Sequence, residues 1–322
     1  MLLVILEHDR GAMAEAGREA LTFGRTLAAK MGEEMHAALI GTDSEELVSE
    51  AGDFGAVAVH TVVHDVLSDF GPEAWGDTIV ALINGLDPEA VLACGTERGN
   101  EVMAQAAARM DVPFVANCAD ITPGEEWSMT RIQWGGSLLE DATLDADRPL
   151  LTCALHTVAS SRAASPEDPE ITTFEVELDA ELSRTVVRDR VVLTAGVTLS
   201  TAPVVISGGR GVGSAEGFVA LEELAELLGG RVGCSRAVTN NGWRPHSDQV
   251  GQTGTRIAPE IYIASGISGA IQHWVGAMGS KHILAVNIDP EANMVKKANW
   301  AVIADLHELI PAVTEEVRRR RA

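Results

Sequence analysis

The stretch APVVISGGRGVGS, residues 202–214, begins as an apolar run and ends in glycines crowded around a single arginine. The apolar run predicts a buried strand, and the glycines predict a tight loop after it. Glycines permit positive φ angles and close backbone approach, and a helix that follows such a loop offers free N–H groups to an anion. Because the forked guanidinium of Arg210 also suits a phosphate, the stretch indicates a phosphate-binding loop.

This loop matches neither of the two common phosphate motifs. Gly208 and Gly213 have the P-loop spacing, but Ser214 stands where that motif needs the lysine that reaches the β- and γ-phosphates. Gly209 and Gly211 can begin a dinucleotide fingerprint, but the third glycine position is again Ser214. The stretch therefore argues against ATP hydrolysis, and by itself it does not identify the phosphate.

Two more polar, glycine-rich loops occur in the same part of the chain, at 234–254 (CSRAVTNNGWRPHSDQVGQTG) and at 265–274 (SGISGAIQHW). Their candidate ligand-binding residues are Ser235, Arg236, Gln249, Gly251, Gln252, Thr253, Gly254, Gln272 and His273. Asn287 and Asp305 stand at the ends of two later strands. Ligands of parallel sheets bind outside the carboxyl ends of the strands, so these loops together predict one nucleotide-type cofactor.

Strands and helices alternate along the first part of the chain, which predicts a mostly parallel sheet flanked by helices. We expect strands at 2–6, 35–41, 56–63, 90–95, 113–117 and 171–178 and helices at 14–31, 73–85 and 100–110. Asp43 or Ser44 is expected to cap a further short helix. Residues 129–158 favour extended segments joined by tight turns, and the polar segment 159–170 favours an exposed loop.

The second part repeats the alternation, so the fold class that we predict is α/β with two domains, each a mostly parallel sheet flanked by helices. We expect strands at 203–209, in the first half of 259–277 and at 300–305, a strand and turn at 281–290, and a strand and loop at 231–238. Helices are expected at 217–230, in the second half of 259–277 and at the end of the chain. Pro311 suits the first turn of that last helix.

Acidic residues are concentrated in the first part of the 322-residue chain, which has a formal net charge of −23. Residues 1–193 hold 35 Asp and Glu against 12 Lys and Arg, whereas residues 194–322 hold 12 of each. This contrast supports domains at 1–193 and 194–322. The lack of a basic excess argues against a nucleic-acid partner, and the acidity indicates either a high-salt organism or a basic docking partner.

The overall composition, with 46% hydrophobic and 22% charged residues, is typical of a soluble globular protein. No apolar run is long enough for a membrane span, so we expect no direct membrane insertion. The start MLLVILEHDRG lacks the features of a signal or transit peptide, which predicts a cytoplasmic protein. Cys94, Cys118, Cys153 and Cys234 form no C-x-x-C pair and are expected to be isolated, reduced core thiols, with no metal site.

Several segments of the second part resemble the alpha subunit of electron transfer flavoproteins. They are VVISGGRGVGS, SRAV, QVGQTGTRIAPEIYIASGISGAIQH, AVNIDPEA and AVIADLHELIPAVTEEV, in the family's order and spacing over about 203–318. The first part resembles the family only in its α/β pattern. The resemblance implies an FAD-binding domain at 194–322 and an alpha–beta heterodimer in which domain 1–193 contacts the beta subunit.

The resemblance also implies a function as an electron carrier without substrate turnover of its own, and so not as an enzyme. Such proteins take electrons from flavin-dependent dehydrogenases, for example the acyl-CoA dehydrogenases of fatty acid beta-oxidation. They pass the electrons to a quinone oxidoreductase or to another acceptor. The beta subunit carries AMP or, in some variants, a second FAD.

Carried over to this sequence, the family's cofactor-binding positions are Arg210, Ser235, Arg236, Gln249, Val250, Gly251, Gln252, Thr253, Ser268, Gly269, Ala270, Ile271, Gln272, His273, Asn287, Asp305 and Leu306.

By resemblance, Arg210 contacts the phosphate-bearing part of FAD, Arg236 lies against the flavin ring, and the Thr253 hydroxyl lies near flavin N5. The turn at 268–273 holds the pyrophosphate through backbone N–H groups, and His273 approaches the O2 edge of the flavin. A cation or donor at these places favours the electron-rich reduced cofactor. By the same resemblance, the residues at 287 and 305 hold the ribose and adenine end.

His246 and Ser247 stand where many simple carriers have an Asn-Asp pair, which leaves open an electron-bifurcating subunit whose partner holds a second FAD. A nicotinamide- or thiamine-diphosphate-dependent enzyme is a further alternative. The chain shows no dinucleotide fingerprint at its first strand, no metal–diphosphate motif and no acid–base pair. A nucleotide-sensing regulator is a third alternative. The first loop of this chain, EHDRGAMAEAG, is not a phosphate loop, which argues against it.

Five other histidines have no cluster of candidate functional residues near them in the sequence, and we interpret them as structural. They are His8, His60, His64, His156 and His282.

Overall fold

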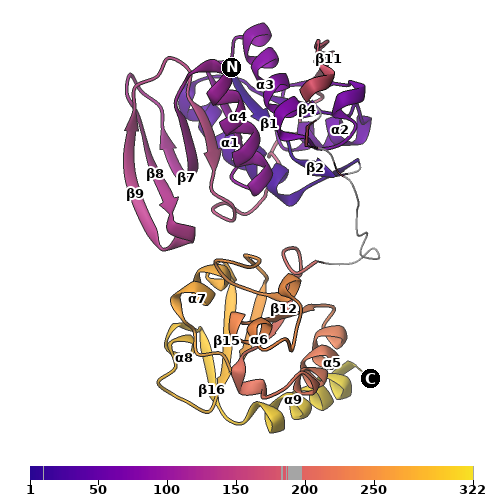
Figure 1. Ribbon diagram of the computed structural model, residues 1–322, viewed down its shortest axis with the longest axis vertical. Coiled ribbons are helices and arrows are strands. Elements are labelled where there is room, and N and C mark those ends of the chain that lie inside the picture. Colours follow the sequence, from indigo (N-terminus) through magenta and orange to yellow (C-terminus); the bar gives the residue numbers. More distant parts are fainter. Residues whose placement is uncertain (10, 183, 186, 188–197, 322) are drawn as a thin grey trace. The chain divides into compact units, whose positions relative to one another are not determined.

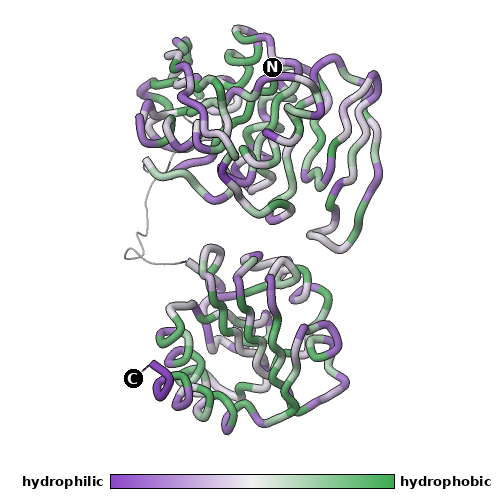
Figure 2. Tube along the Cα trace, turned by 180° about the vertical axis from the view of Figure 1, so that it is seen from behind, coloured by the Kyte–Doolittle hydropathy of each residue, from purple (hydrophilic) through white to green (hydrophobic). Residues whose placement is uncertain are grey.

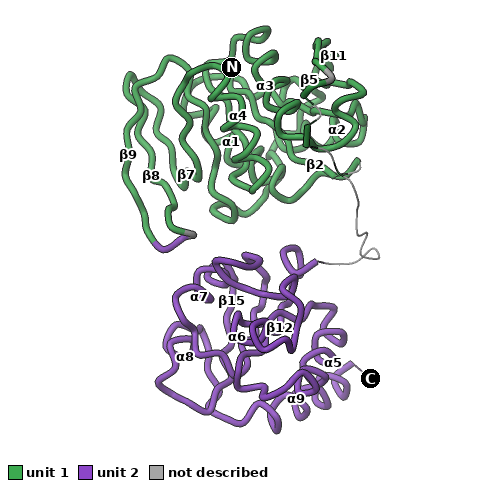
Figure 3. The backbone as a smooth tube through the Cα atoms, in the orientation of Figure 1, with its two compact units in different colours: residues 1–134, 138–191 green, residues 135–137, 192–322 purple. Residues whose placement is uncertain are grey.

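The chain folds into two compact units (Figure 3). The structure is a computed structural model that describes residues 1–9, 11–182, 184, 185, 187 and 198–321. The N-terminal unit comprises Met1–Trp134 and Leu138–Val191, and the C-terminal unit comprises Gly135–Ser137 and Val192–Ala322. The predicted boundary between residues 193 and 194 lies outside the described residues and stays a prediction.

A nine-stranded sheet forms the centre of the N-terminal unit (Figure 1). Its strands are β1 (Leu2–Ile5), β4 (Met35–Ile40), β5 (Ala58–Val62), β6 (Ala90–Cys94), β7 (Phe114–Thr122), β8 (Trp127–Gln133), β9 (Leu138–Leu144), β10 (Leu150–Cys153) and β11 (Glu170–Thr173). They lie in the order β11-β5-β4-β1-β6-β10-β7-β8-β9. Neighbours from β11 to β7 are parallel, whereas β7, β8 and β9 pair antiparallel.

Helices cover both faces of this sheet. They are α1 (Glu15–Met31), α2 (Glu45–Asp53), α3 (Pro72–Leu86) and α4 (Glu97–Met110). Short elements complete the unit, namely the pair β2 (His8–Asp9) and β3 (Ala12–Met13) and the 3-10 turns η1 (Asp65–Leu67), η2 (Trp134–Gly136) and η3 (Ala180–Leu182).

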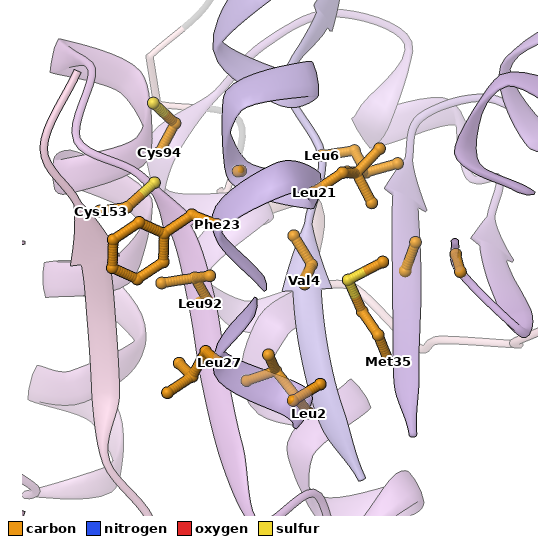
Figure 4. Packing of buried hydrophobic residues seen from close by; sticks show 14 of the residues in the cluster. Leu2, Val4, Leu6, Leu21, Phe23, Leu27, Met35, Leu92, Cys94 and Cys153 are labelled. Carbon is orange, nitrogen blue, oxygen red and sulfur yellow. The ribbon is translucent and has the colours of Figure 1, made fainter. Parts of the chain in front are cut away.

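The core of the N-terminal unit lies on both sides of β1. Leu2 and Val4 belong to one cluster with Leu27 of α1 (Figure 4). Leu3 belongs to a second cluster with Ile79 of α3. Because successive side chains of a strand point to opposite faces, a strand covered on both faces must be apolar throughout, as the run at 2–6 is.

The predicted elements of this unit are confirmed in type, and their ends shift where side chains cap or strands pair. Ser44 caps α2, since its hydroxyl accepts a hydrogen bond from the Leu47 N–H at 3.4 Å. Helix α4 begins at Glu97, before the expected residue 100, because the Thr96 hydroxyl accepts from the Gly99 N–H at 2.8 Å. Strand β7 is longer than expected because it pairs with β8, and β11 ends earlier than expected.

The C-terminal unit contains an all-parallel sheet of five strands. These are β12 (Val204–Gly208), β13 (Arg231–Cys234), β14 (Ile261–Ser265), β15 (His282–Asn287) and β16 (Trp300–Ile303), in the order β13-β12-β14-β15-β16. The helices are α5 (Val219–Leu227), α6 (Arg236–Asn240), α7 (Ile271–Ala277), α8 (Asn293–Lys297) and α9 (Leu306–Arg321), with 3-10 turns η4 (Arg210–Val212), η5 (Glu216–Phe218) and η6 (His246–Asp248).

Two hydrophobic clusters flank this sheet. One joins Leu221 of α5 to Ile310 of α9, and the other joins Tyr262 of β14 to Met294 of α8. Figure 2 shows hydrophobic residues gathered along the central strands of each unit and hydrophilic residues near the C-terminus, where the last turn of α9 carries arginines. The predicted α/β class is therefore confirmed for both units.

Two local predictions in the C-terminal unit are wrong. Residues 236–240 form the short helix α6 where we expected a loop. Pro311 lies inside α9 and outside its first turn, because the helix already begins at Leu306. The Asp305 carboxylate accepts a hydrogen bond from the His307 N–H at 2.9 Å, and so starts the helix earlier than the proline does.

The cysteines are free and buried as expected, but three of them are not isolated. Cys153 of β10 lies in register with Cys94 of β6 on one side and with Cys118 of β7 on the other. The order β6-β10-β7 brings them together, and the sequence order of the strands does not reveal it. Among the described residues, no group of three or more histidines, cysteines, aspartates and glutamates is placed to hold a metal ion.

Two of the histidines that lack partners in the sequence have them in the structure. His60 Nε2 lies 3.1 Å from His36 Nδ1, because β4 and β5 pair side by side. His156 Nδ1 lies 3.0 Å from a carboxylate oxygen of Glu19, which is buried in α1. Among the described helices, none has the length and apolarity that crossing a bilayer requires.

Candidate functional site

A cavity of about 650 Å³ lies at the carboxyl ends of the parallel strands of the C-terminal unit. Its lining residues are Arg210, Gly211, Ser235, Arg236, Ala237, Gly266, Ile267, Ser268, Gly269, Ala270, Gln272, His273, Asn287, Ile288, Asp289, Ala292, Ala304, Asp305, Leu306 and His307. They come from the segments after β12, β13, β14, β15 and β16. All five strands end at one edge of the sheet, so segments far apart in the sequence meet there.

The strand order explains why the cavity forms at this edge. From β12 the chain passes to β13 on one side and then returns to β14 on the other. The loops after β12 and β14 consequently lead away in opposite directions and leave a crevice between them. Such a reversal of strand order is where open α/β sheets bind their ligands.

The glycines after β12 allow the two loops to touch. A β-carbon on Gly209 would lie 2.2 Å from the Gly266 carbonyl oxygen, and one on Gly211 would lie 2.8 Å from the Gly266 α-carbon. The Gly211 N–H donates to the Gly266 carbonyl at 3.1 Å. These glycines are therefore required for contact between the loops, which the sequence suggested only as close backbone approach in general.

The turn before α7 presents backbone donors to the cavity. Gly269 has a φ of +77°, and a β-carbon there would lie 2.4 Å from the Met294 backbone nitrogen. Among the described residues, no hydrogen-bond acceptor is found for the N–H groups of Gly269, Ala270 and Ile271. Free N–H groups at a helix start carry partial positive charge and favour an anion.

Two arginines at the cavity have no acidic partner among the residues that the structure describes. Arg210 and Arg236 line the cavity, are exposed, and form no ion pair with any described carboxylate. Arg244, by contrast, is paired with both Glu222 and Asp248. A guanidinium without an internal carboxylate can bind an external anion in a forked geometry. Arg210 and Arg236 therefore fit a phosphate-bearing ligand, and Arg244 fits a structural role.

A second hollow of about 430 Å³ meets the first at Arg236. The other residues lining it are Thr239, Asn240, His246, Gln249 and Thr253. The Gln249 side chain donates to the Thr253 hydroxyl at 2.9 Å and accepts from the Thr239 hydroxyl at 2.8 Å. Gln249 is 2% exposed, so this bridge fixes the loop that carries Thr253 beside Arg236.

His273 lines the main cavity from the start of α7 but is itself buried, with 6% of its surface exposed. Its Nε2 atom lies 2.7 Å from the hydroxyl oxygen of Tyr262, which is completely buried in β14. Burial lowers the pKa of His273 to about 4, and the Val250 backbone acts in the opposite direction. The imidazole is therefore neutral at pH 7, and it can donate a hydrogen bond without carrying charge.

Asn287 and Asp305, which lie at or just after the ends of β15 and β16, also make hydrogen bonds that stabilise the fold. The Asn287 amide donates to the Ile267 carbonyl at 3.0 Å, and its oxygen accepts from the Asp289 N–H at 3.1 Å. Asn287 thereby ties the segment after β15 to the loop after β14. Asp305 starts α9 at the same cavity, as described above.

The structure brings most of the residues predicted for the site to one cavity. They are Arg210, Ser235, Arg236, Ser268, Gly269, Ala270, Gln272, His273, Asn287, Asp305 and Leu306. Gln249 and Thr253 line the second hollow. The other four residues line neither.

Those four residues have identifiable places in the fold. Val250 is buried in the core. Gly251 approaches Gly276 of α7 so closely that a β-carbon on Gly276 would lie 2.3 Å from it, and the Gln252 N–H donates to the Gln272 carbonyl at 2.7 Å. Ile271 is 59% exposed. Their predicted role in cofactor binding stays a prediction.

Nine of the lining residues are not among the predicted cofactor-binding positions, namely Gly211, Ala237, Gly266, Ile267, Ile288, Asp289, Ala292, Ala304 and His307. Most of them are sequence neighbours of predicted residues. A loop sequence has no periodicity that tells which side faces a cavity, so only their proximity to predicted residues could have indicated them.

Comparison with known proteins gives matches along both units. A model described as "Electron transfer flavoprotein domain" matches residues 2–179, and one described as "Electron transfer flavoprotein FAD-binding domain" matches residues 198–278. The chain is 33% identical to an electron transfer flavoprotein subunit alpha from Thermoanaerobacterium thermosaccharolyticum, covering 98% of this chain and 97% of that protein.

This chain belongs to the electron transfer flavoprotein alpha subunit family. It is also 34% identical to the subunit alpha of Mycobacterium leprae, covering 99% of this chain and 98% of that protein. Protein FixB of Azorhizobium caulinodans is 31% identical, covering 98% of this chain and 88% of that protein. The family match extends to the N-terminal unit, where the sequence motifs alone indicated only a similar α/β pattern.

Proposed function

We propose that the chain is the FAD-binding alpha subunit of a cytoplasmic, heterodimeric electron carrier. It receives electrons from flavin-dependent dehydrogenases, such as acyl-CoA dehydrogenases, and delivers them to a quinone oxidoreductase or another acceptor. The observation that carries this proposal is the cavity of the C-terminal unit. It is lined by two arginines and by the N–H groups of a turn, and neither the arginines nor these N–H groups have a partner among the described residues.

The residues present fit FAD in several respects. The cavity volume lies within the roughly 300–1,000 Å³ that is usual for ligand sites. The Ser235 hydroxyl lines the cavity, is buried and has no hydrogen-bond partner among the described residues, which is the state expected of a group that binds a ligand. The cradle at Gly269 leaves backbone donors exposed, and a β-carbon could not be added there without a clash.

Each part of the cavity would hold a different part of the cofactor. Arg210 and the N–H groups of Gly269 and Ala270 would bind the pyrophosphate by charge and by aligned donors. Asn287 and Asp305 would meet the ribose and adenine end. Arg236 lies where the two cavities join, so it would contact the flavin ring, with Thr253 on one side and His273 on the other.

Bound FAD supplies the site that accepts and releases the electrons. The protein groups around it set how readily it is reduced, because the Arg236 charge and a donor at His273 interact most strongly with an electron-rich ring. No acid–base pair is needed for such a transfer, so the chain would act as a carrier with no turnover of its own.

The acidic surface of the N-terminal unit is proposed to contact the partner subunit. The partner would carry AMP or a second FAD, and a second FAD would make the heterodimer electron-bifurcating. His246 at the second hollow is the residue of this chain that motivates the second alternative. An unspecialised carrier remains the primary proposal.

The test is to produce the chain together with its beta subunit and to measure flavin and nucleotide in the purified heterodimer. We expect one FAD and one AMP per heterodimer and full reduction of that FAD by an acyl-CoA dehydrogenase with its substrate. Two FAD molecules and no AMP would support the bifurcating alternative. A heterodimer that binds no flavin, even when incubated with excess FAD, would overturn the proposal.

A further inference from the structure

Arg244 joins three elements of the C-terminal unit through its guanidinium group. Its Nε atom donates to Asp248 Oδ2 at 2.9 Å, and one terminal nitrogen lies 2.8 Å from the same oxygen. The other terminal nitrogen donates to a carboxylate oxygen of Glu222 in α5. The guanidinium carbon lies 5.5 Å from the centre of the Phe218 ring. Arg244 thus links η6, which contains Asp248, to α5 and to the turn η5 before it.

These contacts are partly shielded from water. The Arg244 side chain is 20% exposed and that of Asp248 is 23% exposed, whereas Phe218 is buried in the core. Burial lowers the pKa of Arg244, but the hydrogen bond with Glu222 and the charge of Asp248 raise the pKa above its usual value. Breaking such a pair is costly, because the partner that remains keeps a charge that water reaches poorly.

Asp248 ends a loop, residues 241–248, that has few other anchors. Most side chains of this loop are exposed, and Trp243 is the one that packs against the core. Among the described residues, the bond from Arg244 to Glu222 is the only side-chain hydrogen bond from the loop to a residue outside it. The position of the loop against α5 therefore depends on this bond.

The loop forms part of the second hollow. His246 lines that hollow, and Asp248 directly precedes Gln249, whose side chain makes the buried bridge described above. The Val250 N–H donates to the Cys234 carbonyl at 2.9 Å, so β13 fixes the chain after this point. Between α6 and this point, the guanidinium link to α5 holds the loop and with it one wall of the hollow.

We propose that Arg244 is a positioning residue that ties the loop 241–248 to α5 and thereby holds one wall of the second hollow beside the flavin ring. This inference rests on the proposed function, in which the ring lies where the two cavities meet. Arg244 is absent from the described linings of both cavities, so it acts through the loop. A wall that is already fixed loses less entropy when the cofactor binds.

Hydrogen exchange measured by mass spectrometry tests the link without any activity assay. The Asp248 and Gln249 N–H groups donate to carbonyls of the loop itself at 3.1 and 3.0 Å, so their exchange reports its opening. In Arg244→Met, we expect these amides to exchange about 3- to 10-fold faster in the heterodimer, with or without FAD. Amides of β14 should be unchanged. Unchanged exchange in the loop, or equal acceleration in β14, would overturn the inference.

The flavin should report the same change. We expect Arg244→Met to bind FAD about 3- to 10-fold more weakly and to have a lower flavin reduction potential, because Thr253 and Arg236 are then held less firmly at the ring. Arg244→Lys keeps the charge but not the forked geometry, so it should recover part of the affinity and part of the slow exchange. If affinity and potential both stay unchanged in Arg244→Met, Arg244 does not position the site.

Glu222→Gln tests whether the attachment to α5 carries the effect. We expect a smaller change in the same direction. The double variant with Arg244→Met should be no worse than Arg244→Met alone, because both substitutions remove the same contact. Fully additive losses would contradict the role of the bond between Arg244 and Glu222.

Arg318→Met is the matched control, because Arg318 of α9 also forms an ion pair with α5, at Glu223. The Arg318 side chain is 55% exposed and is absent from the described linings of both cavities. We expect loop exchange and FAD affinity to stay within about twofold and the potential to stay unchanged. Effects equal to those of Arg244→Met would contradict a specific role for Arg244.

The outcomes for the two proposals are distinguishable. A heterodimer that binds no FAD but shows faster loop exchange in Arg244→Met would contradict the proposed function and confine the role of Arg244 to the loop itself. A heterodimer that binds FAD with the same affinity and potential in Arg244→Met would contradict only the inference about Arg244.

Discussion

Gly269 and Met294 approach so closely that a β-carbon on Gly269 would lie 2.4 Å from the Met294 backbone nitrogen. The same nitrogen donates a hydrogen bond to the Ser268 carbonyl at 3.2 Å. This contact locks the turn before α7 against the segment after β15. The shape of the candidate anion cradle therefore depends on a position where only glycine fits, with a φ of +77°.

Gly269→Ala should destabilise the C-terminal unit and reduce FAD binding. The substitution places a side chain in the left-handed region, which costs about 1–2 kcal/mol, and adds a clash with backbone that cannot rotate away. Chemical denaturation would give the change in the free energy of unfolding, and flavin titration of the folded variant would give the affinity.

Gly229→Ala is the matched control for this prediction. Gly229 also has a positive φ, +67°, but a β-carbon there would meet nothing within 4 Å. We expect only the backbone cost of about 1 kcal/mol and unchanged FAD binding. If the two variants lose the same stability and affinity, the close contact at Met294 has no importance for the site.

Arg210→Ala should weaken FAD binding by about 10-fold or more, since a charge-assisted hydrogen bond contributes roughly 1.5–3 kcal/mol. Arg210→Lys should restore part of the loss, because a lysine keeps the charge but not the forked geometry. Fluorescence titration of the apoprotein with FAD at two salt concentrations would measure both effects. The residual affinity of Arg210→Ala should depend less on salt.

Arg319→Ala serves as the control for charge alone. Arg319 is exposed near the end of α9 and pairs with Glu316 three residues earlier. Its removal should leave FAD affinity within twofold of the starting protein. An equal loss in both variants would mean that net charge, and not a contact made by Arg210, determines the affinity.

His60 should make the N-terminal unit less stable in mild acid. Burial lowers the pKa of His60 to about 4, with a smaller contribution from the charge of His36. Between pH 4 and the unfolded value of about 6.5, the unfolded chain binds a proton that the folded chain does not, so stability rises with pH across this window. The free energy of unfolding should therefore be highest above pH 6.5. It should be about 3 kcal/mol lower once the pH has fallen to about 4.

His60→Gln should flatten this dependence by about one proton when unfolding free energies are measured from pH 4 to pH 7. His64→Gln is the comparison variant, because the His64 ring is only partly buried and its Nδ1 already accepts the Val66 N–H at 3.1 Å. A slope that is the same in His60→Gln and in the unaltered chain would contradict the buried, neutral state of His60.

The cysteines should be inert to thiol reagents in the folded protein. Burial raises the pKa of Cys118 and that of Cys234 to about 12, and a hydrogen bond to Cys153 followed by burial raises the pKa of Cys94. Because the thiolate is the reactive form, we expect no rapid reaction with a disulfide reagent at pH 8.

All four cysteines should react once the chain is unfolded in denaturant. Reaction of one or more equivalents within seconds under native conditions would contradict the buried positions of these side chains. The rate in the folded protein should rise when denaturant increases the population of opened chains.

Much of the fold could be predicted from local sequence, because each strand and helix depends on the spacing of its own apolar residues and caps. The run at 2–6 is buried on both faces, as its unbroken hydrophobicity predicts, and Ser44 caps its helix as expected. An error arose where two local signals compete. Pro311 favours a helix start, but the Asp305 carboxylate, six residues earlier, caps the N–H of His307 and determines where α9 begins.

The sequence predicts which loops form the candidate site, but it does not predict which of their side chains face the cavity. All loops after parallel strands reach one edge of a sheet, so Arg210, Arg236 and His273 were expected to converge. Whether a side chain in such a loop faces the cavity depends on which other loop it packs against. Gly251 faces α7, for example, and Arg210 faces the cavity.

The sequence by itself determined the α/β class, the concentration of acidic residues in the first part, the glycine-rich loops and the resemblance to a family. These follow from composition and from short-range patterns. The tertiary structure alone decided the contacts between distant segments, because strand order and loop packing bring them together. It placed Cys153 between Cys94 and Cys118, paired Arg244 with Glu222, set Arg210 at the cavity, and put the Tyr262 hydroxyl on His273.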